Sequence, residues 1–306
     1  MRQQRLMLAA AAVVTLLVLP AGTFAGVDAG GGRGTSEPRR AAGPLLDPGP
    51  DISPYEGVGT WIDMYDTGPR RKPEAAIDRM AALGVRTLYL QTSNWQKAFA
   101  IYKPDITARL IDRAHEHGIA VVAWYLPSFA TPKKDWRRTK AAIEFETAAG
   151  NRFTSFALDI EATEVRDIAA RNESAISLSR RIRDYVGEGY ALGGIIPDPA
   201  GQLYWPDFPY TEMVEIYDVI LPMGYYTYRT SGYAQTYRYA KRNVTLIRSE
   251  SGDAGVPVHA IGGIAGRASR REVQAFLDGS NAAGVMGVSL YDYPITLDWE
   301  WAKLLR

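Results

Sequence analysis

Two acidic residues close an apolar stretch near the middle of the chain. The run 153–158 reads as a buried β-strand and leads directly into Asp159 and Glu161. At positions i and i+2 of one strand, the two carboxylates point to the same face, roughly 7 Å apart along the chain. Carboxylates are seldom buried without a partner, so the pair indicates a functional site or local partners such as a helix cap or an arginine. One protonated and one ionised carboxylate at a cleft would suit acid-catalysed cleavage of a glycosidic bond.

Other catalytic chemistries find little support in the remaining residues. The chain has three histidines and no cysteine. His115 and His117 are two residues apart near the end of an expected helix, so they do not share a face, and His259 stands alone. This argues against a zinc site, and we expect neither a metal nor a cofactor. There is no Gly-x-Ser-x-Gly motif, and no lysine lies inside an expected strand.

Short apolar runs alternate with helix-like segments from Gly57 onward. The expected strands lie near 58–64, 86–91, 119–126, 153–160, 191–197, 219–223, 258–262 and 286–291. The expected helices lie near 73–83, 105–117, 134–149, 173–186, 211–217, 233–248, 269–282 and 297–305, with Asn172 as one N-cap and a capping box at Ser269 and Glu272. Alternating strands and helices in this number predict an α/β fold, a single (β/α)8 TIM barrel. A doubly wound open sheet is the alternative, but no dinucleotide glycine fingerprint follows the first strand.

The expected C-terminal ends of the strands gather polar and aromatic residues, and barrel enzymes carry their chemistry at this edge. Pyranose rings stack on aromatic side chains, and their hydroxyls bind carboxylates and amides. For any single aromatic residue, packing is the simpler explanation, but their concentration at one edge indicates sugar binding. Besides the acid pair and Tyr225, the expected substrate-binding residues are Asp63, Tyr65, Gln91, Trp95, Trp124, Tyr125, Asp198, Met223, Tyr226, Tyr291 and Asp292.

The first residues predict export. Arg2 and Arg5 precede the apolar run 6–19, which is shorter than the ~20 residues of a membrane span, and small residues precede Gly26. A retained anchor is the alternative to cleavage after Ala25. The expected division of the chain is a signal peptide, a flexible linker and the barrel, over 1–25, 26–52 and 53–306. We therefore expect a secreted or cell-wall-associated protein, without stable membrane association once the signal is cleaved.

The net charge of the chain and the distribution of its basic residues indicate which partners it can bind. The formal net charge is +1, and no basic run is long. Nucleic-acid binding depends on neutralising phosphates with clustered lysines and arginines, so a nucleic-acid partner is not expected. A polysaccharide or oligosaccharide is the expected partner, and the oligomeric state is left open.

The acid pair also resembles motifs of barrels that cleave amino-sugar polymers. Asp159-x-Glu161 resembles the end of the Asp-x-x-Asp-x-Asp-x-Glu signature of the family 18 chitinases, and Met223-Gly224-Tyr225 resembles that family's Met-x-Tyr-Asp. The resemblance implies that Glu161 is the general acid and that Asp159 orients and polarises a substrate N-acetyl group. It implies further that Tyr225 hydrogen-bonds the same group.

A second family shares part of the pattern. Asp159 and Glu161, together with the run 117–121 before the third strand, resemble the family 25 lysozymes. Those enzymes carry acids on strand one, which Asp63 could match. The resemblance is loose and is restricted to short motifs, so it holds at the level of a superfamily of exported glycoside hydrolases.

The chain departs from the chitinase signature at four positions. Thr154 and Ala157 stand where the two earlier acids would be, Tyr226 replaces the acid after Tyr225, and Val288 stands where a tryptophan would form the sugar-binding floor. These departures keep open a non-catalytic carbohydrate-binding protein on a decayed hydrolase barrel. A polysaccharide deacetylase is a third possibility, disfavoured because metal ligands are absent.

The favoured function is a secreted glycoside hydrolase that acts on a β-linked polysaccharide. Glu161 would protonate the leaving oxygen, and Asp159 would stay ionised and stabilise positive charge at the sugar or orient an acetamido nucleophile. The expected outcome is retention of configuration. A second acid across the mouth, Asp63 or Asp292, would instead give a wider carboxylate separation and allow inversion.

Overall fold

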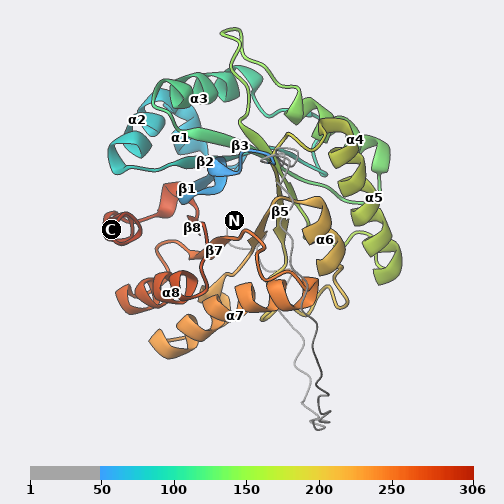
Figure 1. Cartoon of the computed structure of the whole chain (residues 1–306). Coiled ribbons are helices and arrows are strands. Elements are labelled where there is room, and N and C mark those ends of the chain that lie inside the picture. Colours follow the sequence, from blue (N-terminus) through green and yellow to red (C-terminus); the bar gives the residue numbers. More distant parts are fainter. Residues whose placement is uncertain (1–48) are drawn as a thin grey trace, which may run out of the picture. The chain divides into compact units, whose positions relative to one another are not determined.

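The computed structural model describes residues 49–306, and residues 50–306 form one compact unit. Eight parallel strands in the order β6-β5-β4-β3-β2-β1-β8-β7 are surrounded by helices (Figure 1). Parallel bridges from Ile220 to Val258 and from Met223 to Ile261 link the two outer strands of this order, β6 and β7. The predicted single (β/α)8 barrel is confirmed. The predicted signal peptide and most of the predicted linker lie outside the described residues.

The strands and helices alternate along the chain. The strands are β1 Gly57–Ile62, β2 Thr87–Asn94, β3 Ala120–Leu126, β4 Ser155–Asp159, β5 Leu192–Ile196, β6 Val219–Pro222, β7 His259–Ile264 and β8 Gly287–Tyr291. The helices are α1 Thr67–Arg71, α2 Pro73–Leu83, α3 Pro104–Glu116, α4 Pro132–Ile143, α5 Ile168–Val186, α6 Tyr210–Ile216, α7 Tyr233–Ser251, α8 Arg270–Ala282 and α9 Asp298–Leu304. Among the described residues, none of the helices combines the length and apolar character that a bilayer crossing requires.

Side-chain caps mark the starts of α5 and α8. Ser269 and Glu272 form the predicted capping box at the start of α8. The predicted cap at Asn172 is wrong, because α5 begins at Ile168 and the Asp167 side chain accepts from the Ala170 N–H at 2.8 Å. The Asn172 side chain instead holds the loop that follows β5. Helix α4 ends at Ile143, earlier than the predicted 149.

The strands of the barrel are buried on both faces, as parallel strands covered by helices must be. On β4, Phe156 and Leu158 pack outward into the core shared with the helices, whereas Ala157 belongs to a second core inside the barrel. Trp61 and Tyr89 stack in that inner core with their ring centroids 4.2 Å apart. Alternation along β4 therefore directs Asp159 to the inside of the barrel.

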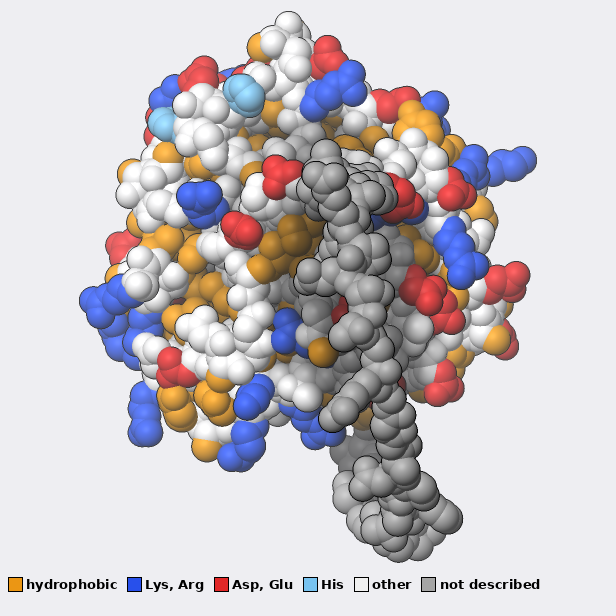
Figure 2. Space-filling view, in the orientation of Figure 1, with side chains coloured by type: hydrophobic (Ala, Val, Ile, Leu, Met, Phe, Trp, Pro, Cys, Tyr) orange, Lys and Arg blue, Asp and Glu red, His pale blue; other side chains and the backbone are white. Residues whose placement is uncertain are grey.

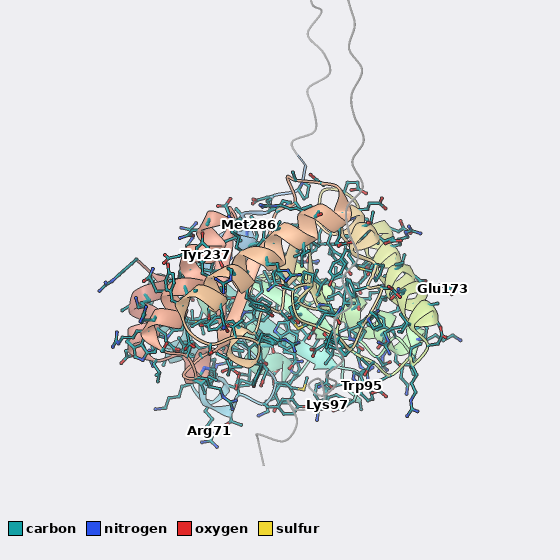
Figure 3. The ribbon with its side chains drawn as sticks, turned by 90° about the horizontal axis from the view of Figure 1, so that it is seen from below. Arg71, Trp95, Lys97, Glu173, Tyr237 and Met286 are labelled. Atoms are coloured by element: carbon teal, nitrogen blue, oxygen red, sulfur yellow. The ribbon has the colours of Figure 1, made fainter. Side chains whose placement is uncertain are left out.

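The two ends of the barrel carry opposite ends of the parallel strands. In Figure 3, Met286, just before β8, lies at the upper side, and Trp95 and Lys97, just after β2, lie at the lower side. We call the end that carries the C-terminal ends of the strands the mouth. His115 and His117 are at the end of α3, away from the mouth. Acidic and basic side chains are both present on the face of the molecule shown in Figure 2.

Candidate active site

Asp159 and Glu161 lie together where β4 ends. Asp159 is the last residue of the strand and is 5 % exposed, and Glu161 follows it, partly buried. The Asp159 Oδ1 atom is buried and has no hydrogen-bond partner within residues 49–306. A buried carboxylate oxygen without a partner is costly, and structural acids in protein interiors are normally paired. Asp159 thus differs from acids that stabilise a fold.

Burial and mutual repulsion control the protonation of the pair. Burial raises the pKa of Asp159 well above its ordinary value, and the charge of Glu161 raises it further. Burial also raises the pKa of Glu161. Two adjacent carboxylates that are both withdrawn from water ionise together only at a high cost, so the pair retains a proton more readily than either isolated acid would. The more deeply buried Asp159 is the favoured carrier of that proton before a ligand binds.

Two tyrosines lie within electrostatic reach of the pair. Burial raises the pKa of Tyr225, and the charges of Glu161, Asp159 and Asp292 add to this effect. The pKa of Tyr204 is raised by burial and by some of the same charges, those of Glu161 and Asp159 included. Both phenols therefore stay protonated and can donate a hydrogen bond to a ligand. Tyr204 was not predicted, although it lies in the loop after β5 and thus at the same edge as Asp159.

A second group of acids forms where β1 and β8 meet. Asp63, Asp66 and Asp292 each bring one carboxylate oxygen within 4.8 Å of the others. The Asp63 carboxylate accepts hydrogen bonds from the Tyr65 N–H at 2.5 Å and from the Tyr291 hydroxyl at 3.2 Å. Asp66 accepts from the Asp63 N–H at 2.9 Å. The predicted residues Asp63, Tyr291 and Asp292 are thus brought together, with Asp66 as an addition that the prediction did not contain.

Aromatic rings connect the two groups of acids. The rings of Tyr225 and Tyr291 are 6.1 Å apart at 65°, and Tyr291 lies 6.3 Å from Trp61. Trp61 meets Trp124 edge to face at 6.0 Å. Trp124 and Met223 belong to the inner core, which places both predicted residues below the mouth as its floor. The Trp124 Nε1 atom is buried and finds no acceptor within the described part of the chain.

The loops after β1 and β2 supply the rim on one side. Tyr65 is 43 % exposed, and Lys97 lies over its ring at 5.2 Å. The Tyr65 hydroxyl accepts a hydrogen bond from Asn94 Nδ2 at 3.2 Å. Gln91 is buried, and its Oε1 accepts from the Met64 N–H at 3.0 Å, so this residue supports the loop. Trp95 lies at the mouth side, partly buried (Figure 3).

Two predicted binding residues, Tyr125 and Tyr226, do not present their side chains to the mouth. Tyr125 is fully buried against α4, and its hydroxyl donates to Asp135 at 2.6 Å. Tyr226 packs outward on Phe276 of α8 with ring centroids 5.5 Å apart. The substrate contacts predicted for these two residues are corrected, because both point into the layer between barrel and helices.

Asp198 also has a different environment from the one predicted. Its carboxylate is buried, forms an ion pair with Arg229 at 3.2 Å and accepts a short hydrogen bond from Tyr239. These contacts hold the loop after β5 against α7.

Val288 faces the outer core, and the aromatic residue that ends β8 near the mouth is Tyr291.

Comparison with known proteins adds information on the fold. No family model and no curated protein matches the chain. Among solved structures, the endo-beta-1,4-mannanase from Thermotoga petrophila is similar with a TM-score of 0.62 and 11 % identity, over 82 % of this chain and 75 % of that one. The spore cortex-lytic enzyme SleL from Bacillus cereus gives 0.59 and 10 %, over 82 % and 73 %. A chitinase from Chromobacterium violaceum gives 0.58 and 14 %, over 81 % and 98 %.

These similarities confirm the resemblance to glycoside hydrolase barrels as one of fold. At such identities the shared architecture is established, and the site must be argued from its own residues.

Proposed function

We propose that this protein is a secreted glycoside hydrolase with Glu161 as its general acid. The observation that carries the proposal is the acid pair at the end of β4, in which Asp159 is buried and its Oδ1 atom has no hydrogen-bond partner within residues 49–306. In barrel enzymes the catalytic groups lie at the C-terminal ends of strands. A pair of carboxylates that retains a proton is suited to protonate the oxygen of a leaving sugar.

The proton must reside on Glu161 when the glycosidic bond breaks. Asp159 holds it more firmly in the free protein because it is more deeply buried and feels the charge of Glu161. A glycan bound over the mouth would remove water from the partly buried Glu161 and raise its pKa further. The proton then passes to Glu161, and the ionised Asp159 stabilises positive charge at the sugar or orients an acetamido group.

Tyr225 fits the role of a donor beside the reacting sugar. Its phenol is protonated and feels the charges of both acids. We infer retention of configuration, because Asp159 ends β4 and Glu161 follows two residues later, which leaves the other side of the mouth to Tyr225 and Tyr291. Water activation by Asp63 or Asp292 would give inversion instead, and the anomeric form of the first product distinguishes the two outcomes.

The polysaccharide is proposed to be β-linked. The similar structures are a beta-1,4-mannanase, chitinases and a spore cortex-lytic enzyme. The basic, apolar and small-residue pattern of positions 1–25 supports export, with the protein in the medium or at the cell wall. An N-terminus near Gly26 on protein from the medium is expected, whereas an intact Met1 on membrane-bound protein would indicate a retained anchor.

One observation favours a second function, that of a carbohydrate-binding protein without activity. Ala157 precedes Asp159 on the inner face of β4 and offers no hydrogen bond to its orphaned oxygen. A barrel that has lost catalytic support could retain an aromatic mouth for binding. A binder retains polymer and produces no new reducing ends.

The decisive experiment compares Glu161→Gln with Glu164→Gln. Wild-type protein is first screened on cell-wall and storage glycans, with products identified by mass spectrometry. Glu161→Gln keeps the shape but removes the transferable proton, so turnover is expected to fall about 10²–10⁴-fold while polymer binding remains. Glu164 is exposed three residues away and serves as the matched control. Equal activity of the two variants would refute the role of Glu161. Absence of any product from wild type would favour the binding protein.

A further inference from the structure

A groove on the outer wall of the barrel gathers cations and a tryptophan. It lies where α8, α9 and the start of α7 meet, and its volume is about 530 Å³. The side chains that line it include Tyr233, Arg270, Arg271, Gln274, Trp299 and Lys303. Lys and Arg side chains gather along the lower-left edge of the view in Figure 2, where Figure 1 places α7, α8 and the C-terminal helix.

The cations of the groove keep donors available. Arg270 lies over the Trp299 ring at 4.8 Å, and Lys303 donates to Gln274 Oε1 at 2.7 Å. Arg271 is exposed. Within residues 49–306, none of these three cations forms an ion pair. Their charges are therefore not matched by direct contact with an acid.

Two acids of α8 near Arg270 and Arg271 in sequence are committed to other contacts. Glu272 accepts from the N–H groups of Ser269 and Gly232, each at 2.8 Å. Asp278 accepts from the Tyr233 hydroxyl at 2.6 Å and from Gln274 Nε2 at 2.9 Å. These bonds anchor α7 and α8 to each other and leave the guanidinium groups of the groove for an external anion.

The first residues of α8 connect the groove to the mouth. Helix α8 follows β7, so its first residues, Arg270 and Arg271, lie at the mouth end of the barrel. Arg267, in the loop before α8, lies 5.9 Å over the ring of Tyr228, which follows β6. A basic strip thus leads from the mouth rim to the groove.

We propose that this groove binds an anionic stretch of the polysaccharide, through carboxylate or phosphate groups. Arginine forks match both anions, and the Trp299 ring holds one of these guanidinium groups, that of Arg270, in the groove. The inference rests on the proposed function, because it identifies the bound polymer with the glycan that enters the mouth. This glycan therefore carries negative charge outside the segment that is cleaved.

The test measures binding without turnover. Full-chain protein carrying Glu161→Gln is titrated with polygalacturonate, poly(glycerol phosphate) and neutral mannan at low and high salt. Arg270→Ala with Arg271→Ala is compared with Arg238→Ala with Arg242→Ala, a change of equal charge at exposed positions of α7 outside the groove. The groove variant is expected to raise Kd for one anionic polymer at least about tenfold, as the loss of two charge-assisted contacts predicts.

Each outcome has a meaning. The anionic polymer whose Kd rises in the groove variant identifies carboxylate or phosphate as the recognised group. An equal loss in both double variants, or equally tight binding of neutral mannan, would overturn the proposal. So would a DNA duplex that competes as well as the anionic glycan. Arg270→Lys with Arg271→Lys, which keeps the charge, should recover part of the affinity, and thermal melting verifies folding. Because binding is read without hydrolysis, an inactive wild type would refute the proposed function and leave this result standing.

Discussion

The Tyr291 hydroxyl donates a hydrogen bond to Asp63 Oδ2 at 3.2 Å and so joins the ends of the neighbouring strands β8 and β1. Burial and the charge of Asp63 raise the pKa of Tyr291, which keeps the phenol a donor. The same ring lies 6.1 Å from that of Tyr225, close to the acid pair of β4. One residue thereby connects the two groups of acids at the mouth.

Tyr291→Phe tests this connection. The variant keeps the ring and removes the donor, so Asp63 loses one of its two side-chain contacts. We expect kcat/KM to fall about tenfold and the free energy of unfolding to fall by about 0.5–1.5 kcal/mol, the usual net worth of one hydrogen bond. Tyr185→Phe, at an exposed tyrosine of α5 that bonds Glu144, is the control. Identical kinetics for wild type and Tyr291→Phe would show that Asp63 needs no positioning.

Asp159→Asn should move the pH dependence of activity. The negative charge shared by the pair raises the pKa of the catalytic acid, and asparagine removes one carboxylate. Glu161 then loses its proton at lower pH. The alkaline limb of the profile of kcat/KM against pH is expected to shift to lower pH, and turnover should fall as well. An unchanged alkaline limb would mean that Asp159 and Glu161 titrate independently.

The same variant should be more stable at neutral pH. A carboxyl whose folded pKa is raised contributes stability below its unfolded pKa, and that stability is lost as the pH rises through the folded pKa. Asp159→Asn removes this loss of stability, which amounts to about 1.4 kcal/mol for each unit by which the pKa of Asp159 is raised. In chemical denaturation, the free energy of unfolding of Asp159→Asn relative to wild type should therefore rise between pH 4 and pH 7. A constant difference across that range would contradict the raised pKa of the pair.

His259 should make the fold sensitive to acid. It is fully buried, its Nδ1–H donates to the Tyr55 carbonyl oxygen at 2.8 Å, and Nε2 accepts from the Ser289 hydroxyl at 3.1 Å. Burial lowers its pKa to about 4. Because the folded pKa lies below the ordinary value of 6.5, stability is complete above pH 6.5 and falls as the pH drops towards 4. The loss should reach about 3 kcal/mol.

Two variants isolate this effect. His259→Asn retains a donor for the Tyr55 carbonyl but cannot gain a proton, so it should be less stable at pH 7 and show a smaller decline between pH 6.5 and pH 4. His115→Gln, at an exposed position of α3, should decline as wild type does. Equal declines in all three proteins would assign the acid sensitivity to other groups.

Chelation should leave activity intact. The three carboxylates Asp63, Asp66 and Asp292 lie close enough to suggest a cation, but both oxygens of Asp63 accept hydrogen bonds, as does Oδ2 of Asp66. We expect turnover after EDTA treatment and dialysis to match that of untreated enzyme. Loss of activity that returns with added calcium or magnesium would assign a metal to this cluster.

The sequence by itself determined the barrel and its principal acid pair. Apolar runs at regular spacing predicted the strands, and glycine and capping residues predicted several helix ends, such as the start of α8 and the ends of α2 and α5. Period-two alternation predicted one shared side for Asp159, which ends β4, and Glu161, which follows it. These features depend on neighbours along the chain, so they could be predicted without a three-dimensional structure.

The tertiary structure decided which way the other residues face. Parallel strands are apolar on both sides, so the pattern of β3 could not show that Trp124 lies inside the barrel while Tyr125 packs on α4. It could not show either that Asp66 and Asp292, 226 positions apart in the chain, would meet at the closure of β1 with β8. Likewise, the groove beside Trp299 exists only because α8 and α9 pack together. Contacts between distant segments depend on barrel closure, and local spacing carries no record of it.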